Sequence, residues 1–135
     1  MGLLHLEIIS PERLLVQEEV DMVEAHGPFG EFGILPGHIQ FLTTLHIGEI
    51  RFMQSGKTIY LATSGGVAEV LDDRVTFLVE TAEFAHEINI DRAKIAQERA
   101  ETMMKELTLD DKDYRIFETA LFRALTRISV ASRST

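Results

Sequence analysis

The sequence predicts a mixed fold of β then α: an N-terminal antiparallel β-sandwich over residues 1–86 and a C-terminal antiparallel two-helix hairpin over residues 87–135. All three prolines and all nine glycines lie before residue 67, so the strongest turn-forming residues are confined to the first part. Apolar residues alternate with polar ones there, whereas after residue 87 they recur at every third or fourth position. The change of period separates a region of strands from a region of helices.

Short alternating segments between turn signals indicate the strands of the first part. Many short strands at close spacing predict antiparallel pairing, because parallel neighbours would need intervening helices and none is expected there. The first strand, residues 3–9, places Leu4, Leu6 and Ile8 on one face. Later strands are expected at IRFM, TIYLAT, VAEVL and VTFLV, with breaks at GPFGEFG, LPG, QSGK, SGG and LDDR.

The segment GEFGILPGH, residues 30–38, combines three glycines and a proline. Proline presets φ at the second position of a type II turn and glycine adopts the positive φ of the third, so Leu35–His38 predicts such a turn. The segment is either an ordinary tight connection or a shaped contact loop. His38 is either catalytic or, as is commoner, a turn histidine hydrogen-bonded to the backbone.

Two amphipathic helices are predicted in the second part. Asn89 can cap the first helix and the aspartates of TLDDKD can cap the second, with a loop of about five residues between them. Narrow, alanine-rich stripes bury little apolar area, so the hairpin should be marginal alone and should dock on the β-domain or on a partner. The hairpin is either docked permanently on the β-domain or able to move away from it. The two stripes are Ala93, Ala96, Ala100, Met103 and Leu107, and Tyr114, Phe117, Leu121, Ala124 and Ile128.

Charge is unevenly distributed along the chain, whose net charge is −9. Residues 1–86 contain 13 acidic and four basic residues, whereas residues 87–135 contain nine of each. An acidic β-domain argues against nucleic acid as a partner, since phosphates would be repelled. The absence of cysteine, of a long apolar run and of a signal-peptide pattern predicts a soluble, intracellular chain without disulfides.

The usual catalytic motifs are missing from the sequence. It contains no P-loop, no Gly-x-Ser-x-Gly elbow and no cysteine nucleophile, and its five histidines lack metal-ligand spacing. We therefore expect neither catalysis by this chain alone nor a metal site. Arg123 and Arg127, four residues apart on one helix face, form either a solvated basic face or a site for carboxylates or phosphate.

Four separated motifs, in order, resemble the epsilon subunit of bacterial F-type ATP synthases over almost the whole chain. GEFGILPGH is similar to the family's Gly-Glu-x-Gly-x-x-Pro-x-His turn, and GGVAEVLDDRVTFLVETAE to its closing strands. IDRAKIAQERAE and ALFRALTRISVA are similar to its two C-terminal helices. The resemblance implies a β-sandwich followed by a helical hairpin, in agreement with the periodicity.

The resemblance also implies a role. Such subunits are non-catalytic, bind the gamma subunit and the c-ring, couple proton-driven rotation to ATP synthesis, and inhibit ATP hydrolysis through the C-terminal helices. They lie peripherally at the cytoplasmic face of the bacterial inner membrane and require no cofactor. The alternative is a stand-alone ligand-binding β-sandwich with a helical dimerisation hairpin. The implied contact residues are Glu31, Gly33, Pro36 and His38 for the c-ring and gamma, and Arg115, Arg123, Arg127 and Arg133 for the catalytic beta (and alpha) subunits.

Some bacterial relatives bind regulatory ATP through an Ile/Leu-Asp-x-x-Arg-Ala motif. The matching stretch here is INIDRA, residues 88–93, in which Asn89 replaces the aspartate. Asparagine keeps an acceptor oxygen and a helix cap but loses the negative charge, so the resemblance implies a weakened ATP site. Alternatively, the arginines only pair with Glu87, Glu98 and Glu118. The implied nucleotide residues are Glu83, Asn89, Arg92, Arg99, Arg123 and Arg127.

Overall fold

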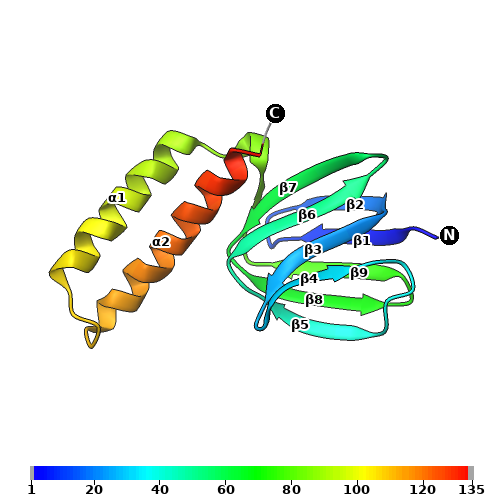
Figure 1. Ribbon diagram of the computed structural model, residues 1–135, viewed down its shortest axis with the longest axis horizontal. Coiled ribbons are helices and arrows are strands. Elements are labelled where there is room, and N and C mark those ends of the chain that lie inside the picture. The colour runs from blue at the N-terminus through cyan, green and yellow to red at the C-terminus, as the bar shows by residue number, and fades with distance from the viewer. Residues whose placement is uncertain (1, 134–135) are drawn as a thin grey trace.

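A computed structural model describes residues 2–133; Met1, Ser134 and Thr135, at the outer ends of the two predicted domains, lie outside the described residues. Ten strands form two stacked sheets, and two helices form a hairpin beside them (Figure 1). The predicted fold class, a β-sandwich followed by a two-helix hairpin, is confirmed.

Each layer of the sandwich is a five-stranded sheet. The first sheet has the order β2-β1-β9-β8-β5, and the second has the order β10-β7-β6-β3-β4. The first sheet contains β1 (Leu4–Ile9), β2 (Leu14–Val20), β5 (Phe41–Leu45), β8 (Gly66–Leu71) and β9 (Arg74–Val79). The second contains β3 (Met22–Gly27), β4 (Gly30–Ile34), β6 (Gly48–Gln54), β7 (Lys57–Thr63) and β10 (Ala82–Phe84).

One strand pair departs from the predicted antiparallel arrangement. Strands β1 and β9 pair in parallel, in a register that runs from His5 opposite Arg74 to Ile9 opposite Leu78. Parallel strands need an intervening helix only when they follow each other closely in the chain. Here the chain crosses the second sheet several times between β1 and β9, so it can return in the same direction without a crossover helix.

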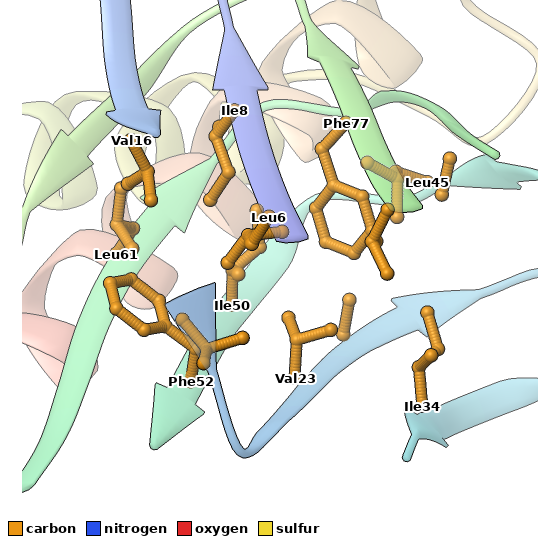
Figure 2. Packing of buried hydrophobic residues seen from close by; sticks show 14 of the residues in the cluster. Leu6, Ile8, Val16, Val23, Ile34, Leu45, Ile50, Phe52, Leu61 and Phe77 are labelled. Carbon is orange, nitrogen blue, oxygen red and sulfur yellow. The ribbon is translucent and has the colours of Figure 1, made fainter. Parts of the chain in front are cut away.

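Alternation along the strands creates the core. In β1 every second residue is buried, as the spacing of Leu4, Leu6 and Ile8 predicts. Figure 2 shows Ile8 and Phe77 of the first sheet pointing toward the second, from which Phe52 and other side chains point back. This core is made entirely of residues from the β-domain.

The segment after β4 forms the turn that its sequence predicts. The His38 backbone N–H donates to the Leu35 carbonyl over 3.1 Å, and Gly37 has a φ of 87°. That positive φ is the conformation that a type II turn requires at its third position. The Gly37 N–H also donates to an Asp73 carboxylate oxygen at 2.7 Å, which ties the turn to the β8–β9 connection.

The helices begin at the predicted caps. After the short 3₁₀ helix η1 (Ala85–Glu87), α1 spans Ile90–Glu106 and α2 spans Lys112–Ala131. The Asn89 side-chain oxygen accepts from the Arg92 N–H at 3.0 Å, and an Asp111 carboxylate oxygen accepts from the Asp113 N–H at 3.2 Å. These bonds satisfy N–H groups that a helix start leaves free. No helix within residues 2–133 combines the length and the hydropathy of a membrane span.

The hairpin touches the sandwich mainly through the end of α2. Val130 and Ala131 of α2 pack with Ala62 of β7 and Ile88 of the connection, next to Tyr60 and Ala85. The remote end of the hairpin, where α1 turns into α2, extends away from the sheets (Figure 1). Docking therefore depends on a small apolar cluster and on the polar contacts around it.

Candidate functional site

Five charged side chains meet on the outer face of the second sheet, and we call them the Arg51 cluster: Glu24, Glu31, Glu49, Arg51 and Arg133. The Arg51 guanidinium donates to both oxygens of Glu24, at 2.9 and 3.0 Å. It also donates to Glu49 at 3.0 Å and to Glu31. Glu49 accepts in addition from Arg133 at 3.1 Å, which links the chain just beyond α2 to the sheet.

Strand register explains why these residues meet. Glu24 of β3 lies directly opposite Arg51 of β6, and Glu49 lies two residues before Arg51 on the same face. Glu31 lies on β4, the other neighbour of β3. A guanidinium presents several N–H donors in one plane, so one arginine can hold three carboxylates that would otherwise repel each other.

Pairing within the cluster shifts the ionisation of Glu24 and Arg51 toward their charged forms. Hydrogen bonding from Arg51 lowers the pKa of Glu24, and hydrogen bonding to Glu24 raises the pKa of Arg51. Both residues thus remain charged across the physiological range. With three carboxylates and two guanidiniums, the cluster carries one net negative charge.

The four predicted c-ring and gamma residues do not form a single loop. Glu31 and Gly33 belong to strand β4, whereas Pro36 and His38 lie in the turn after it. The expected contact loop is therefore a strand plus a turn, because the register with β3 begins immediately at Gly30 opposite Gly27. The His38 ring shares a 2.8 Å hydrogen bond with the Ile39 carbonyl, as expected of a turn histidine.

The predicted nucleotide residues are only partly brought together. Glu83 binds Arg127 in bidentate fashion, at 2.7 and 3.2 Å, in a pocket that Arg123 also lines. The volume of this pocket is about 40 Å³, far below the ~300 Å³ of small ligand sites. Asn89 serves as a helix cap, while Arg92 and Arg99 lie exposed on α1 and do not line the pocket.

Two of the four arginines expected to face the catalytic subunits are already paired in this conformation. Arg127 binds Glu83, and the Arg133 guanidinium binds Glu49 while lying 5.4 Å from the centre of the Tyr60 ring. Arg115 and Arg123 are exposed on α2. Arg127 thus pairs within the chain, but with Glu83 and not with Glu87, Glu98 or Glu118, the partners that the alternative named.

Sequence reasoning missed Glu24, Glu49 and Arg51, whose signal is the placement of opposite charges on one face of neighbouring strands. It also missed the bidentate pair of Arg13 and Glu87, at 3.0 and 2.8 Å. This pair joins the β1–β2 connection to η1 at the base of the hairpin. Hydrogen bonding from Arg13 lowers the pKa of Glu87 to about 2.

The outer face of the first sheet has a different character, because exposed aliphatic side chains lie among its polar ones and the hairpin docks on the other sheet. Val67 of β8 lies opposite Leu78 of β9, and both are exposed. Leu42 and Leu71 extend this face along β5 and β8 and are exposed as well. The outer face of the first sheet therefore exposes several aliphatic side chains, whereas that of the second sheet carries the Arg51 cluster.

Comparison with known proteins agrees with this architecture. Residues 3–85 match the β-sandwich domain of the ATP synthase delta/epsilon chain, and residues 86–132 match its long alpha-helix domain. The ATP synthase epsilon chains of Geobacter sulfurreducens and Citrifermentans bemidjiense are each 50% identical over 131 residues, which cover 97% of this chain and 95% of theirs. These matches confirm the resemblance to bacterial epsilon subunits and disfavour a stand-alone ligand-binding protein.

Solved structures give the same result. A chain in the cryo-EM structure of the Euglena gracilis mitochondrial ATP synthase, described as OSCP/F1/c-ring, aligns with a TM-score of 0.79 and 27% identity, covering 93% of this chain and 80% of that one. A chain from the Tetrahymena thermophila mitochondrial ATP synthase central stalk/c-ring aligns with a TM-score of 0.56 at 13% identity, which supports the fold alone. The chain belongs to the ATP synthase delta/epsilon chain family.

Proposed function

We propose that this chain is the non-catalytic central-stalk subunit of a bacterial F-type ATP synthase. In this role it couples proton-driven rotation of the c-ring to ATP synthesis and restrains ATP hydrolysis through its C-terminal helices. The observation that carries the proposal is the succession of the two family domains over residues 3–132 in a chain 50% identical to bacterial epsilon chains. As part of that complex, it would lie peripherally at the cytoplasmic face of the inner membrane.

The exposed aliphatic side chains on the outer face of the first sheet support a permanent contact with the gamma subunit. They are Leu42, Val67, Leu71 and Leu78, on a rigid sheet. Burying apolar surface contributes ~25 cal/mol per Å², so a partner that covers this face can be held firmly. Because the hairpin lies against the other sheet, this contact does not depend on the state of the hairpin.

The β3–β4 hairpin supports a contact with the c-ring. Glu31 lies exposed near its tip, and Phe29 in the tip is fully exposed. An acidic group beside an aromatic ring suits a partner that presents basic loops. Gly33, Pro36 and His38 would extend the contact along β4 to the following turn. Binding through Glu31 has to replace or share its ion pair with Arg51.

The weakly docked hairpin supports the role of a brake. Once released, Arg115, Arg123, Arg127 and Arg133 would present complementary charge to an acidic loop of the catalytic beta (and alpha) subunits. Exposed ion pairs contribute only ~0–1 kcal/mol each, so they cannot stall a rotor alone. They would act by biasing a two-state hairpin, whose population responds tenfold to each ~1.4 kcal/mol.

Regulatory ATP is a further part of the proposal, as a weak ligand and not as a required cofactor. In the docked hairpin, the Glu83–Arg127 pair lies in the small pocket that Arg123 also lines, and little free volume remains there. A nucleotide would have to displace that pair and widen the pocket. Together with the loss of the aspartate at Asn89, this favours weak binding.

Affinity purification of a tagged full-length chain from membranes tests the central-stalk role. We expect the gamma subunit, the c-ring and the catalytic subunits to be recovered with it. A variant with Leu42→Glu and Leu78→Glu should lose these partners while remaining folded, because both side chains are exposed. Recovery of the tagged chain as a free homodimer would contradict the proposal and would support the stand-alone alternative.

A further inference from the structure

We infer that Arg51 is a positioning residue that couples Glu31 to the docking of the helical hairpin. When an external cation engages Glu31, Arg51 keeps its bonds to Glu24 and interacts more strongly with Glu49, so that the ion pair of Glu49 with Arg133 weakens. The c-ring as the source of that cation rests on the proposed function; the coupling itself is a property of the chain alone.

The pathway consists of three direct ion pairs. Arg51 joins Glu31 through one terminal nitrogen and Glu49 through the other, the latter at 3.0 Å. Glu49 then joins Arg133 at 3.1 Å through its second oxygen. One carboxylate is thus divided between two arginines, of which one faces β4 and the other anchors the end of the hairpin.

Burial makes this shared carboxylate sensitive to its neighbours. The Glu49 side chain is 11% exposed, compared with 40% for Glu31 and 24% for Glu24. Interactions of a largely buried charge are less screened by water and salt than those at the surface. A change in the pairing of Arg51 should therefore be felt more strongly at Glu49 than at an exposed carboxylate.

The sign of the coupling follows from the charges. With Glu31 in place, Arg133 faces Glu24, Glu31, Glu49 and Arg51, whose charges sum to −2. When Glu31 is neutralised by a partner, the sum is −1 and Arg51 competes more strongly for Glu49. Both changes weaken the attraction on Arg133. By thermodynamic reciprocity, undocking the hairpin must favour cation binding at Glu31.

The surroundings leave room for such an exchange. A cavity of about 430 Å³ opens between the second sheet and α2, and Glu31, Glu49, Arg51 and Arg133 all line it. The apolar contact at the end of α2 is small, with Val130 and Ala131 as its buried helix residues. A modest electrostatic change can therefore alter the docked fraction measurably.

The test measures docking in the isolated full-length chain. Because the sequence contains no cysteine, spin labels can be attached at Lys57→Cys and Lys105→Cys, two exposed sites outside the Arg51 cluster. Distance distributions between the labels give the ratio of docked to undocked hairpin. This ratio is determined for Glu31→Gln, for Arg133→Gln and for the double variant.

We expect each single change to lower the docking ratio and the two effects to be non-additive by a factor of about two to five at low salt, the range of partly exposed ion pairs. The factor should shrink at high salt. In an Arg51→Met background, the non-additivity factor should fall by at least half. Glu69→Gln, which makes the same charge change on the opposite sheet, should leave docking unchanged.

Arg51→Lys keeps the positive charge but not the planar fork, so it provides a second test if Arg51→Met fails to fold. Its non-additivity should also be reduced. Additive effects of Glu31→Gln and Arg133→Gln, or an undiminished factor in the Arg51 variants, would overturn the inference. Neither outcome bears on the proposed role in the central stalk, which the purification experiment tests separately.

Discussion

The β-sandwich and the helical hairpin differ greatly in how much apolar surface holds them in place. Eighteen buried residues form the core of the sandwich, including Phe52 and Phe77. Four buried residues, two of them alanines, join the hairpin to it. One chain thus combines a rigid β-sandwich, suited to permanent contacts, with a helical hairpin whose docking is finely balanced.

Ion pairs replace apolar burial at the boundary between the two regions. Arg13–Glu87, Arg127–Glu83 and Arg133–Glu49 all connect the sandwich to the hairpin or to its base. Such pairs respond to salt, pH and competing charges, whereas a packed core does not. Chemical conditions should therefore affect the hairpin before they affect the sandwich.

The largest expected effect concerns the core. Phe77→Ala should reduce the free energy of unfolding by ~3–5 kcal/mol, because it removes a fully buried ring between the two sheets. Urea denaturation followed by circular dichroism measures this change. Phe122→Ala, on the exposed side of α2, serves as the matched control and should cost less than ~1 kcal/mol. Equal losses of unfolding free energy in the two variants would contradict the difference between the sandwich core and the hairpin.

Removal of the hairpin is the next test. A chain truncated after Glu87 should retain a folded sandwich, because the core contains no residue beyond Ala82. When the complex contains the truncated chain, its rate of ATP hydrolysis should rise by about fivefold or more. Such a rise corresponds to removing a free-energy bias of ~1 kcal/mol toward the inhibited state. Steady-state ATPase assays at several salt and nucleotide concentrations measure this rise. Unchanged hydrolysis in complexes of normal composition would show that the hairpin does not act as a brake.

A smaller effect is expected at the first helix cap. Asn89→Asp should strengthen ATP binding by about threefold to fivefold, since a charged acceptor makes stronger hydrogen bonds than a neutral one. Isothermal titration of the full-length chain with ATP compares the two proteins. The substitution preserves the cap that receives the Arg92 N–H, so helix stability should not change. Identical affinities would refute the weakening, and the absence of binding in both would remove the site.

The smallest effect is a pH dependence at the base of the hairpin. The pKa of Glu87 is lowered from 4.5 to about 2 by Arg13, so the pair stabilises the fold above pH 4.5 and loses its contribution as pH falls toward 2. Arg13→Gln should therefore be less stable than the parent chain at pH 7, and the difference should narrow below pH 4.5. Urea midpoints across this range measure it. Arg74→Gln, with the same charge change on β9, should show no such narrowing.

The change from strands to helices and five of the ten strands could be predicted from the sequence, because they depend on local patterns. Strands β2, β3, β5 and β10 were missed, and the expected break at GPFGEFG was wrong, since most of it pairs as β4 with β3. Alternation placed Leu4, Leu6 and Ile8 toward the core, and the apolar period changed where the helices begin. The turn at Gly37 and the cap at Asn89 follow from the conformational and hydrogen-bonding preferences of single residues. Each of these features depends on neighbours a few positions away in the chain.

The parallel pairing of β1 with β9 and the members of the Arg51 cluster were decided by the tertiary structure. Arg51 meets Glu24 only because β3 and β6 adopt one register, and Arg133 reaches Glu49 across 84 positions of sequence. Arg127 pairs with Glu83, on a distant strand, and not with the glutamates nearer in sequence. Periodicity determines which face a side chain occupies, but the partner on that face depends on how strands and helices are placed, and that placement is set by the packing of the whole core.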